Sequence, residues 1–291
     1  MHAGLVLIDK PEGWTSHDVV ARIRKVAGTR RVGHAGTLDP MATGLLVLGV
    51  ESATKLLTFI VGADKTYEAT IRLGASTITD DRESEFLTQA STEAVALVSE
   101  SDIRVAIEKL TGDIEQVPSS VSAIKVDGVR SYAKVRGGEE VKLKARPVTV
   151  SRFEIVGEPR RVDGFIDVDV IVDCSSGTYI RALARDLGES LGIGGHLTAL
   201  RRTRVGGYTI DQAQALPEAT DPLTVIPSFE ASKAFPTLEL TEQQVTDLRH
   251  GKRLPNAQKL QGDIAAVFED RLIAMLIPSG DQLKSQVVFN D

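Results

Sequence analysis

Apolar and acidic side chains alternate along residues 166–173, which read Ile-Asp-Val-Asp-Val-Ile-Val-Asp. The apolar residues at 166, 168, 170 and 172 fall on one face of an extended chain, which is typical of a half-exposed β-strand. Further strands are predicted at 4–8, 45–50 and 67–73, in runs with only occasional helices between them. Because strands and helices do not alternate strictly, we expect an α+β fold: a largely antiparallel mixed sheet with flanking helices.

Local signals predict where two helices begin and end. Ser16 precedes apolar residues at helical spacing and is predicted to cap a helix that ends at Gly28. Thr178 is predicted to cap a second helix, which ends at Gly192. Between strands, residues 31–43 contain glycine and proline too densely for regular structure, so they are predicted to form a loop.

A proline-rich stretch suggests a domain boundary. Prolines stand at positions 217, 222, 227 and 236, and strand-like runs follow them. We expect a large domain at 1–227, with a basic insertion at about 125–152, and a small β-rich domain at 228–291.

The charge distribution is more informative than the total charge. The chain has 34 Lys and Arg against 40 Asp and Glu, a net charge of −6, which excludes a uniformly basic nucleic-acid binder. Residues 19–38 nevertheless carry five Lys and Arg and no acid, and residues 125–152 carry eight basic residues against three acidic ones. Basic runs next to glycine-rich or aromatic motifs indicate a cleft that binds a polyanion.

The sequence offers no ligand set for a metal or cofactor. Its five histidines are far apart, Cys174 is its one cysteine, and it contains neither a phosphate-binding P-loop nor a dinucleotide-binding glycine motif. We therefore expect acid–base or carboxylate chemistry without metal or cofactor. The first residues have no basic n-region, and no apolar run approaches the ~20 residues that span a bilayer, so we expect a cytoplasmic protein without a membrane partner.

Residues 31–44 form the most unusual segment, Arg-Val-Gly-His-Ala-Gly-Thr-Leu-Asp-Pro-Met-Ala-Thr-Gly. Asp39 lies at the end of this glycine-spaced segment, which follows five cations and precedes a buried strand. Glycines allow backbone to approach a bulky ligand closely. The pattern favours a carboxylate at the floor of a cleft whose walls bind phosphates.

This segment and several others resemble the TruB-type tRNA pseudouridine synthases. The matching motifs follow in the order of that family: 7–16, 33–44, Asp-Lys-Thr-Tyr at 64–67 with Leu-Gly at 73–74, 118–125, Cys-Ser-Ser-Gly-Thr-Tyr-Ile-Arg at 174–181, and Leu-Arg-Arg-Thr-Arg at 200–204. The resemblance implies the pseudouridine synthase fold, an isomerase, and conversion of uridine 55 in the T loop of tRNA to pseudouridine without a cofactor. It also implies that the domain at 228–291 is a PUA-like RNA-binding domain, although its own residues resemble that domain only weakly.

The resemblance assigns three catalytic residues. Asp39 matches the catalytic aspartate, Arg181 the arginine that pairs with it, and Tyr67 the active-site tyrosine. A carboxylate in a dry cleft would be driven toward its neutral form, and a guanidinium neighbour counters this. The tyrosine offers a ring face for the uracil and a hydroxyl that can exchange a proton.

Other residues are expected to bind the substrate. His34 matches the residue that stacks where the flipped bases leave the RNA, and Lys10 matches a lysine for which we favour a support role. Tyr179 and Leu200 correspond to residues that line the pocket. The expected contacts with the T stem-loop come from the basic runs: Arg30, Arg31 and Lys125.

Three alternatives remain at this stage. A non-catalytic RNA-binding or RNA-folding module fits the basic runs, an RNA-guided pseudouridine synthase of the dyskerin type fits the motifs, and a glycosidase would release free uracil. We expect no obligatory protein partner, against the dyskerin type. The sequence also leaves open whether Asp39 attacks the ribose carbon, adds to the uracil ring, or guides elimination through a glycal.

Overall fold

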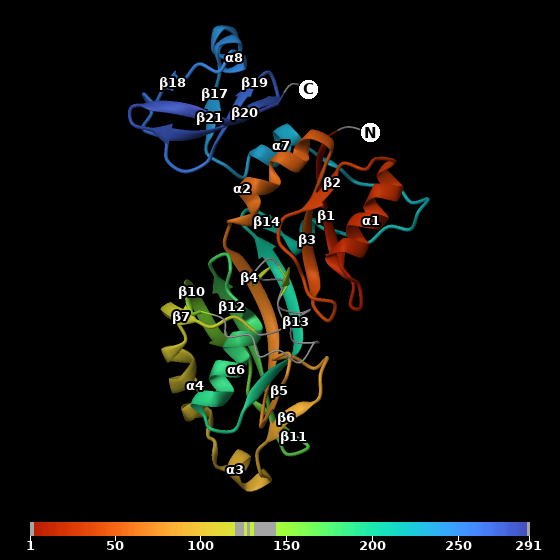
Figure 1. Ribbon diagram of the computed structural model, residues 1–291, viewed down its shortest axis with the longest axis vertical. Helices are drawn as coiled ribbons and strands as arrows, with labels where there is room; N and C mark the ends of the chain where they lie inside the picture. The colour runs from red at the N-terminus through yellow and green to blue at the C-terminus, as the bar shows by residue number, and fades with distance from the viewer. Residues whose placement is uncertain (1–2, 120–124, 127–128, 131–143, 290–291) are drawn as a thin grey trace. The chain divides into compact units, whose positions relative to one another are not determined.

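The computed structural model describes residues 3–119, 125–126, 129–130 and 144–289. The chain forms two compact units (Figure 1). Unit 1 comprises Met1–Pro40, Gly44–Gly62 and Val205–Asp291, and unit 2 comprises Met41–Thr43 and Ala63–Arg204. The sequence-based boundary between 227 and 228 stays a prediction.

The first strands of unit 1 form a hydrogen-bonded sheet with the order β15-β1-β3, in which β16 also pairs with β1 and β2 with β3. The elements of unit 1 are β1 (Gly4–Lys10), α1 (Ser16–Ala27), β2 (Val32–His34), β3 (Thr43–Val50), the 3-10 helix η1 (Glu51–Lys55), α2 (Leu57–Val61), β14 (Tyr208–Thr209), the 3-10 helix η2 (Ile210–Gln212), β15 (Gln214–Ala215), β16 (Ile226–Pro227), α7 (Ser228–Ser232), β17 (Thr237–Glu239), α8 (Glu242–Arg249), β18 (Leu254–Pro255), β19 (Ile264–Phe268), β20 (Arg271–Ser279) and β21 (Gln282–Val288).

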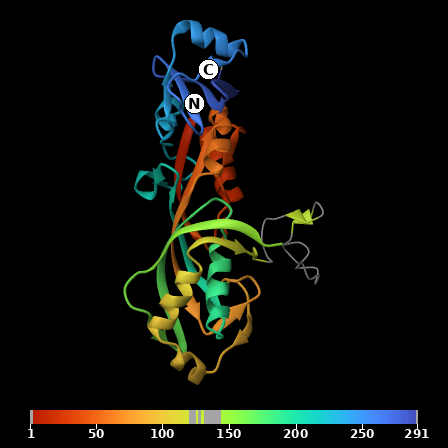
Figure 2. The ribbon, with the colours of Figure 1, turned by 90° about the vertical axis from the view of Figure 1, so that its left-hand side faces the viewer.

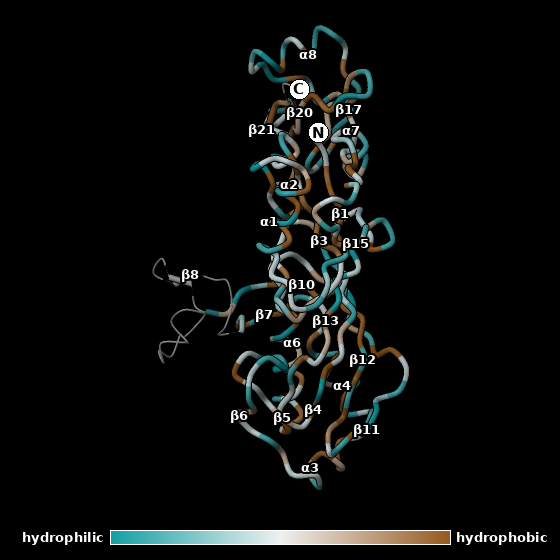
Figure 3. The backbone as a smooth tube through the Cα atoms, turned by 90° about the vertical axis from the view of Figure 1, so that its right-hand side faces the viewer, coloured by the Kyte–Doolittle hydropathy of each residue, from teal (hydrophilic) through white to brown (hydrophobic). Residues whose placement is uncertain are grey.

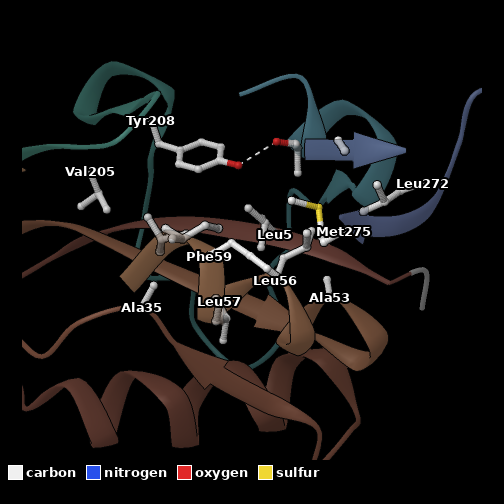
Figure 4. Close-up of a cluster of buried hydrophobic side chains, with 14 of the residues drawn as sticks. Leu5, Ala35, Ala53, Leu56, Leu57, Phe59, Val205, Tyr208, Leu272 and Met275 are labelled. Carbon is white, nitrogen blue, oxygen red and sulfur yellow. Dashed lines mark hydrogen bonds between the residues drawn. The ribbon is translucent and has the colours of Figure 1, made fainter. Parts of the chain in front are cut away.

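The C-terminal strands of unit 1 form a second sheet with the order β17-β19-β20-β21-β18. Its two faces are both covered, since residues alternate between two apolar clusters: Ile264 and Ala266 pack with Leu248 of α8, whereas Ala265 and Val267 pack in the cluster that contains β1 and η1 residues. Figure 4 shows this second cluster, in which the Tyr208 hydroxyl donates a hydrogen bond to the Ala231 carbonyl. In Figure 3 strand β1 is coloured hydrophobic and the loops around α8 mostly hydrophilic.

Unit 2 is built on strands in the order β13-β4-β12-β10-β7, with β11 beside β12. Helices α4 and α6 pack against each other and against β10 and β4, respectively (Figures 1 and 2). The elements of unit 2 are β4 (Lys65–Leu73), β5 (Ala75–Thr77), β6 (Phe86–Gln89), α3 (Thr92–Leu97), α4 (Glu100–Lys109), β7 (Gly112–Gln116), β8 (Lys125–Val126), β9 (Val129–Arg130), β10 (Arg146–Ile155), β11 (Arg160–Val162), β12 (Phe165–Cys174), α6 (Ile180–Ser190) and β13 (Gly195–Val205).

The predicted fold class is confirmed. Strand β12 runs antiparallel to both β4 and β10, and parallel pairing is found for β1 with β15 and β17 with β19. The alternation that predicted β12 is visible in its side chains: Val168, Val170 and Val172 are buried, while Asp169 and Asp173 form ion pairs with arginines of the neighbouring strands β11 and β10.

Both N-terminal helix caps predicted from the sequence are wrong by one residue. Thr15, not Ser16, caps α1: its hydroxyl accepts from the Asp18 amide, and Asp18 accepts in return from the Thr15 amide. Ser and Thr are both favoured at the N-cap, and Ser is slightly the better of the two, so residue type alone pointed to Ser16. Helix α6 has Tyr179 at its N-cap without a side-chain bond, and the Thr178 hydroxyl donates to the Ser175 carbonyl instead.

The predicted loop at 31–43 is also partly wrong. Val32–His34 forms strand β2, which pairs antiparallel with β3 from Val32 opposite Val50 to His34 opposite Leu48. Gly33 is part of this strand, and its missing side chain leaves room for Leu57 of α2. An added Cβ would lie 3.1 Å from the Leu57 Cδ1. The glycine therefore permits helix packing here rather than a turn.

Candidate active-site residues

Asp39 lies half-buried in the loop between β2 and β3, and the residue on each side of it is held through its backbone. The Leu38 amide donates to the Ser16 hydroxyl at 2.8 Å, and that hydroxyl is 3.1 Å from the Leu38 carbonyl. The Pro40 carbonyl accepts from the Gly13 amide at 2.8 Å and from the Lys10 ammonium at 3.3 Å. The loop is therefore anchored immediately before and after its carboxylate.

Lys10 is fully buried at the end of β1. Its ammonium donates to the Trp14 carbonyl at 2.7 Å and the Pro11 carbonyl at 3.0 Å, besides Pro40. These carbonyls belong to the segment that leads into α1 and to the Asp39 loop. These three contacts are made to backbone carbonyls, and the support role that we favour for Lys10 stays a prediction.

His34 is half-buried at the end of β2, and the His17 ring approaches it edge-on, with ring centroids 5.9 Å apart and an interplanar angle of 75°. His17 is exposed in the first turn of α1, and sequence reasoning did not select it. Arg30 and Arg31 are both exposed just before β2, and Arg31 lies 3.6 Å from Glu51. An exposed pair at this distance contributes little to stability, so Arg31 can exchange its partner readily.

The remaining predicted residues lie in unit 2. Tyr67 is buried on β4, and Leu200 is buried on β13. Arg181 is buried in the first turn of α6, two residues after Tyr179. The side-chain amide of Gln116 holds the backbone of Tyr179 twice, as acceptor from its amide at 2.8 Å and as donor to its carbonyl at 3.1 Å.

Arg181 has a carboxylate partner that the sequence did not suggest. Its guanidinium lies 3.3 Å from Asp81, and it donates to the Thr79 carbonyl at 2.8 Å. The Asp81 side chain also accepts from the Glu83 amide at 3.0 Å and from the Thr79 hydroxyl. The sequence did not predict Asp81 as a functional residue, because it lies in the acid-rich stretch 64–102, and such a composition is typical of a solvated surface. It is in fact 1% exposed.

Asp80, next to Asp81, pairs with the other arginine on the same face of α6. Arg185 lies 3.3 Å from Asp80 and donates to the Val117 carbonyl at 2.7 Å. Burial raises the pKa of Asp80, and the Arg185 and Arg181 charges counter part of that rise. Asp80 also has a φ of 58°, a conformation that costs energy for a non-glycine residue. Since Arg181 and Arg185 are four residues apart, two successive carboxylates meet two successive turns of one helix face.

A further buried charge, Lys65, lies on β4, on the same face as Tyr67. Lys65 is two residues before Tyr67 and donates to the Ala63 carbonyl at 2.6 Å. Burial, reinforced by the charge of Arg202, lowers the pKa of Lys65 to about 8. Cys174 is the partner of Lys65 on β12, and burial raises the pKa of its thiol to about 11. Residue type alone does not reveal that the pKa of Lys65, beside Tyr67, is lowered.

Lys125 lies in β8, which pairs with β9. Most of the predicted basic insertion, at 127–128 and 131–143, lies outside the described residues. Within the described part of the chain, no three His, Cys, Asp or Glu side chains come together as a metal site. In that same part no helix is long and apolar enough to cross a membrane.

The proposed catalytic residues thus fall into two groups. Unit 1 brings Lys10 and His34 into the same unit as the Asp39 loop, with Arg30 and Arg31 just before β2. In unit 2, Arg181 of α6 pairs with Asp81, and α6 packs against β4, the strand that contains Tyr67. The pairing of Asp39 with Arg181 stays a prediction.

Comparison with known proteins identifies the family. The family model of the TruB family pseudouridylate synthase N-terminal domain matches residues 24–180, that of the tRNA pseudouridylate synthase B C-terminal domain matches 181–222, and that of the tRNA pseudouridine synthase II C-terminal domain matches 235–290. The protein named tRNA pseudouridine synthase B of Arthrobacter sp. (strain FB24) is 56% identical over 300 residues, covering 99% of this chain and 97% of the relative. The protein of the same name from Leifsonia xyli subsp. xyli is 65% identical over 253 residues, covering 87% and 83%.

Solved structures give the same class of fold. A chain in the crystal structure of a Cbf5-Nop10-Gar1 complex is similar with a TM-score of 0.71 and 25% identity, covering 98% of this chain and 84% of that one. A chain in a structure of an H/ACA RNP bound to a substrate RNA containing 2'-deoxyuridine also has a TM-score of 0.71, at 24% identity, covering 99% and 85%. The fold is therefore that of the pseudouridine synthases. The chain belongs to the TruB family of pseudouridylate synthases and is an isomerase of that class.

Proposed function

We propose that this protein converts uridine 55 in the T loop of tRNA to pseudouridine. The reaction breaks the N-glycosidic bond of the uridine, turns the uracil, and joins its C5 to the same ribose carbon. The relatives at 56% and 65% identity are named tRNA pseudouridine synthase B, which supports tRNA as the substrate. Because nothing is hydrolysed or oxidised, the second carboxylate that glycosidases use to activate water is not needed, and neither is a cofactor.

The anchored Asp39 loop is the observation that carries the proposal. A carboxylate that acts on a single ribose carbon or uracil ring has to be held in a fixed direction. The backbone contacts of Leu38 and Pro40 supply such a hold in unit 1. In this proposal Asp39 acts as nucleophile or as stabiliser of a cationic sugar, by attack on the ribose carbon, addition to the ring, or a glycal route.

Arg181 is proposed to pair with the Asp39 carboxylate. Its contacts with Thr79 and Asp81 hold the guanidinium at the start of α6. A guanidinium carries five N–H donors in a planar fork, so these contacts are compatible with a further carboxylate partner. Tyr67 is proposed to stack on the uracil and to exchange a proton, and Tyr179 and Leu200 to line the pocket.

The target uridine lies inside folded tRNA, so it has to be flipped out of its stack. We assign His34 to the space that the flipped bases leave, since a planar polar ring at the end of β2 can stack there. Arg30, Arg31 and Lys125, with the rest of the basic insertion, are proposed to contact phosphates of the T stem-loop, and the PUA-like domain at 228–291 to contact the RNA as well. Affinity is then expected to fall steeply with salt, because phosphate contacts release counterions.

The test is to incubate the purified protein with an unmodified tRNA transcript and to map pseudouridine. We expect modification at position 55 alone, and none when Asp39 is replaced in Asp39→Asn. That variant should still bind tRNA with near wild-type affinity. Pseudouridine formation by Asp39→Asn would remove this residue from the mechanism, and an affinity that hardly changes with salt would contradict the assignment of the phosphate contacts.

An RNA-guided activity is a second candidate, because a chain of a Cbf5-Nop10-Gar1 complex shares the fold at 25% identity. The same assay separates the two: turnover of tRNA by the protein alone, without guide RNA or further proteins, favours direct recognition. Release of free uracil would instead indicate a glycosidase. Binding without modification would indicate an RNA-binding or RNA-folding module.

A further inference from the structure

Ser16 makes an unusual pair of contacts for the first residue of a helix. Its side chain is 1% exposed and takes no part in capping α1, since Thr15 does so. The hydroxyl instead contacts Leu38, 22 residues further along the chain, accepting from its amide at 2.8 Å and lying 3.1 Å from its carbonyl as donor. One side chain thereby satisfies both backbone hydrogen-bonding groups of a buried residue.

These bonds fix the peptide plane that leads into Asp39. The Leu38 carbonyl and the Asp39 nitrogen belong to the same planar peptide, so a bond to that oxygen also orients the Asp39 backbone. On the other side, the ring of Pro40 restricts the conformation of Asp39 to the extended region. The Pro40 carbonyl is in turn held by Gly13 and Lys10. The peptide before Asp39 is thus held by Ser16, and the chain is held again one peptide beyond the Asp39–Pro40 bond, which together restrict the direction of the Cα–Cβ bond of Asp39.

We propose that Ser16 is a positioning residue for the reaction: its hydroxyl aims the Asp39 carboxylate by locking the Leu38 backbone. This inference rests on the proposed function, in which Asp39 is the catalytic carboxylate. Ser16 is buried under the loop and is not assigned any contact with the RNA. Its removal should therefore slow the chemical step and leave substrate binding unchanged.

The test is the single-turnover rate of pseudouridine formation by Ser16→Ala with saturating enzyme. A displacement of about 1 Å in a catalytic group can lower the rate about 100-fold, so we expect a fall between about 10-fold and 100-fold. The reaction amplitude and the dissociation constant for tRNA should equal those of the wild type. A partial loss of folded protein would instead leave the rate constant unchanged, as long as the remaining active enzyme still saturates the tRNA.

Thr15→Ala is the matched control, because it removes the neighbouring hydroxyl and weakens the α1 cap without touching Leu38. We expect it to keep the wild-type rate constant. Ser16→Thr keeps a hydroxyl on the same carbon and is expected to recover most of the rate. Ser16→Cys keeps the size of the side chain with a much weaker donor and acceptor, and it should fall between Ser16→Ala and the wild type.

Three results would overturn the inference: a wild-type rate constant in Ser16→Ala, an equal loss in Thr15→Ala, or an equal loss in Ser16→Ala and Ser16→Thr. If Ser16→Ala does not fold at the assay temperature, a wild-type rate constant in the folded Ser16→Cys variant overturns it. Failure of the proposed function is a different outcome, because the wild-type protein itself would then form no pseudouridine.

Discussion

Two short loops hold the proposed catalytic groups, and they do so by different means. In unit 1, the loop around Asp39 is held through backbone groups, by the Ser16 hydroxyl, the Gly13 amide and the Lys10 ammonium. In unit 2, the segment from Thr79 to Asp81 holds Arg181 through a buried ion pair, with a second pair beside it.

The difference follows from what each loop has to position. Ser16, Gly13 and Lys10 act on backbone groups of Leu38 and Pro40, so they position the Asp39 loop through its main chain. A buried guanidinium needs compensating charge, since an unpaired buried ion is costly. The Asp39 loop should therefore tolerate loss of one anchor with a modest loss of stability, whereas loss of one charge in unit 2 should have a large effect.

Asp81→Asn should have the largest effect. It leaves the Arg181 charge buried without this partner, and breaking a buried pair in this way costs about 3–5 kcal/mol. The free energy of unfolding, measured in urea, checks the stability. We also expect the rate of pseudouridine formation to fall, because Arg181 loses the contact that orients it.

The exposed pair of Arg104 and Glu100 on α4 provides the control, since both side chains are about half exposed. Glu100→Gln should change stability little. If the Asp81 and Glu100 variants lost equal stability, charge compensation would not distinguish the buried loop from the surface.

Lys10→Met tests the other side of the comparison. It removes the ammonium that holds the Pro11, Trp14 and Pro40 carbonyls, and buried acceptors left without a donor cost about 1–3 kcal/mol. The loss should be smaller than in Asp81→Asn, and the rate constant should fall while tRNA binding persists. A loss of tRNA affinity with an unchanged rate constant would instead make Lys10 a direct RNA contact.

This contrast also explains what the sequence could and could not predict. The strand β12 and the α1 terminus at Gly28 depend on local periodicity and residue type, and both predictions are confirmed. The contact of Ser16 with Leu38 joins residues 22 apart, and no local pattern encodes it. The local pattern therefore predicts Ser16 as the N-cap of α1, a role that the adjacent Thr15 fills.

Asp81 illustrates the opposite error. Its neighbourhood is rich in acids, which by composition indicates a solvated surface, but the fold buries it against α6. Its partner Arg181 lies 100 residues further along the chain, so no local pattern joins the two. The roles of Asp39, Tyr67 and Arg181 came from family motifs and stay predictions.

Gly28→Ala should separate stability from catalysis within unit 1. Gly28 ends α1 with a φ of 64°, which an alanine adopts with strain, so we expect a loss of roughly 1 kcal/mol. Gly28 lies at the opposite end of α1 from Ser16, whose hydroxyl contacts Leu38, so the rate constant should not change. A combined loss of stability and rate would show that the Asp39 loop responds to the stability of α1 as a whole.

The smallest expected effect is a pH dependence of stability that comes from unit 2. The folded-state pKa of Lys65 is about 8, against 10.5 for the ordinary side chain, so between these values the unfolded chain binds more protons and stability rises with pH. Cys174 acts in the opposite direction, because its pKa is raised from 9.0 to about 11, so stability falls with pH between those values. The contribution of Lys65 should thus be clearest between pH 8 and 9, at about 1 kcal/mol or less.

Urea unfolding at pH 8 and at pH 9 measures this contribution. Lys65→Met should abolish the rise in stability, whereas Cys174→Ala should extend it above pH 9. The contacts between Ser16 and Leu38 contain no titratable group, so Ser16→Ala should leave this pH dependence intact. A rise that persisted in Lys65→Met would place the titrating group elsewhere.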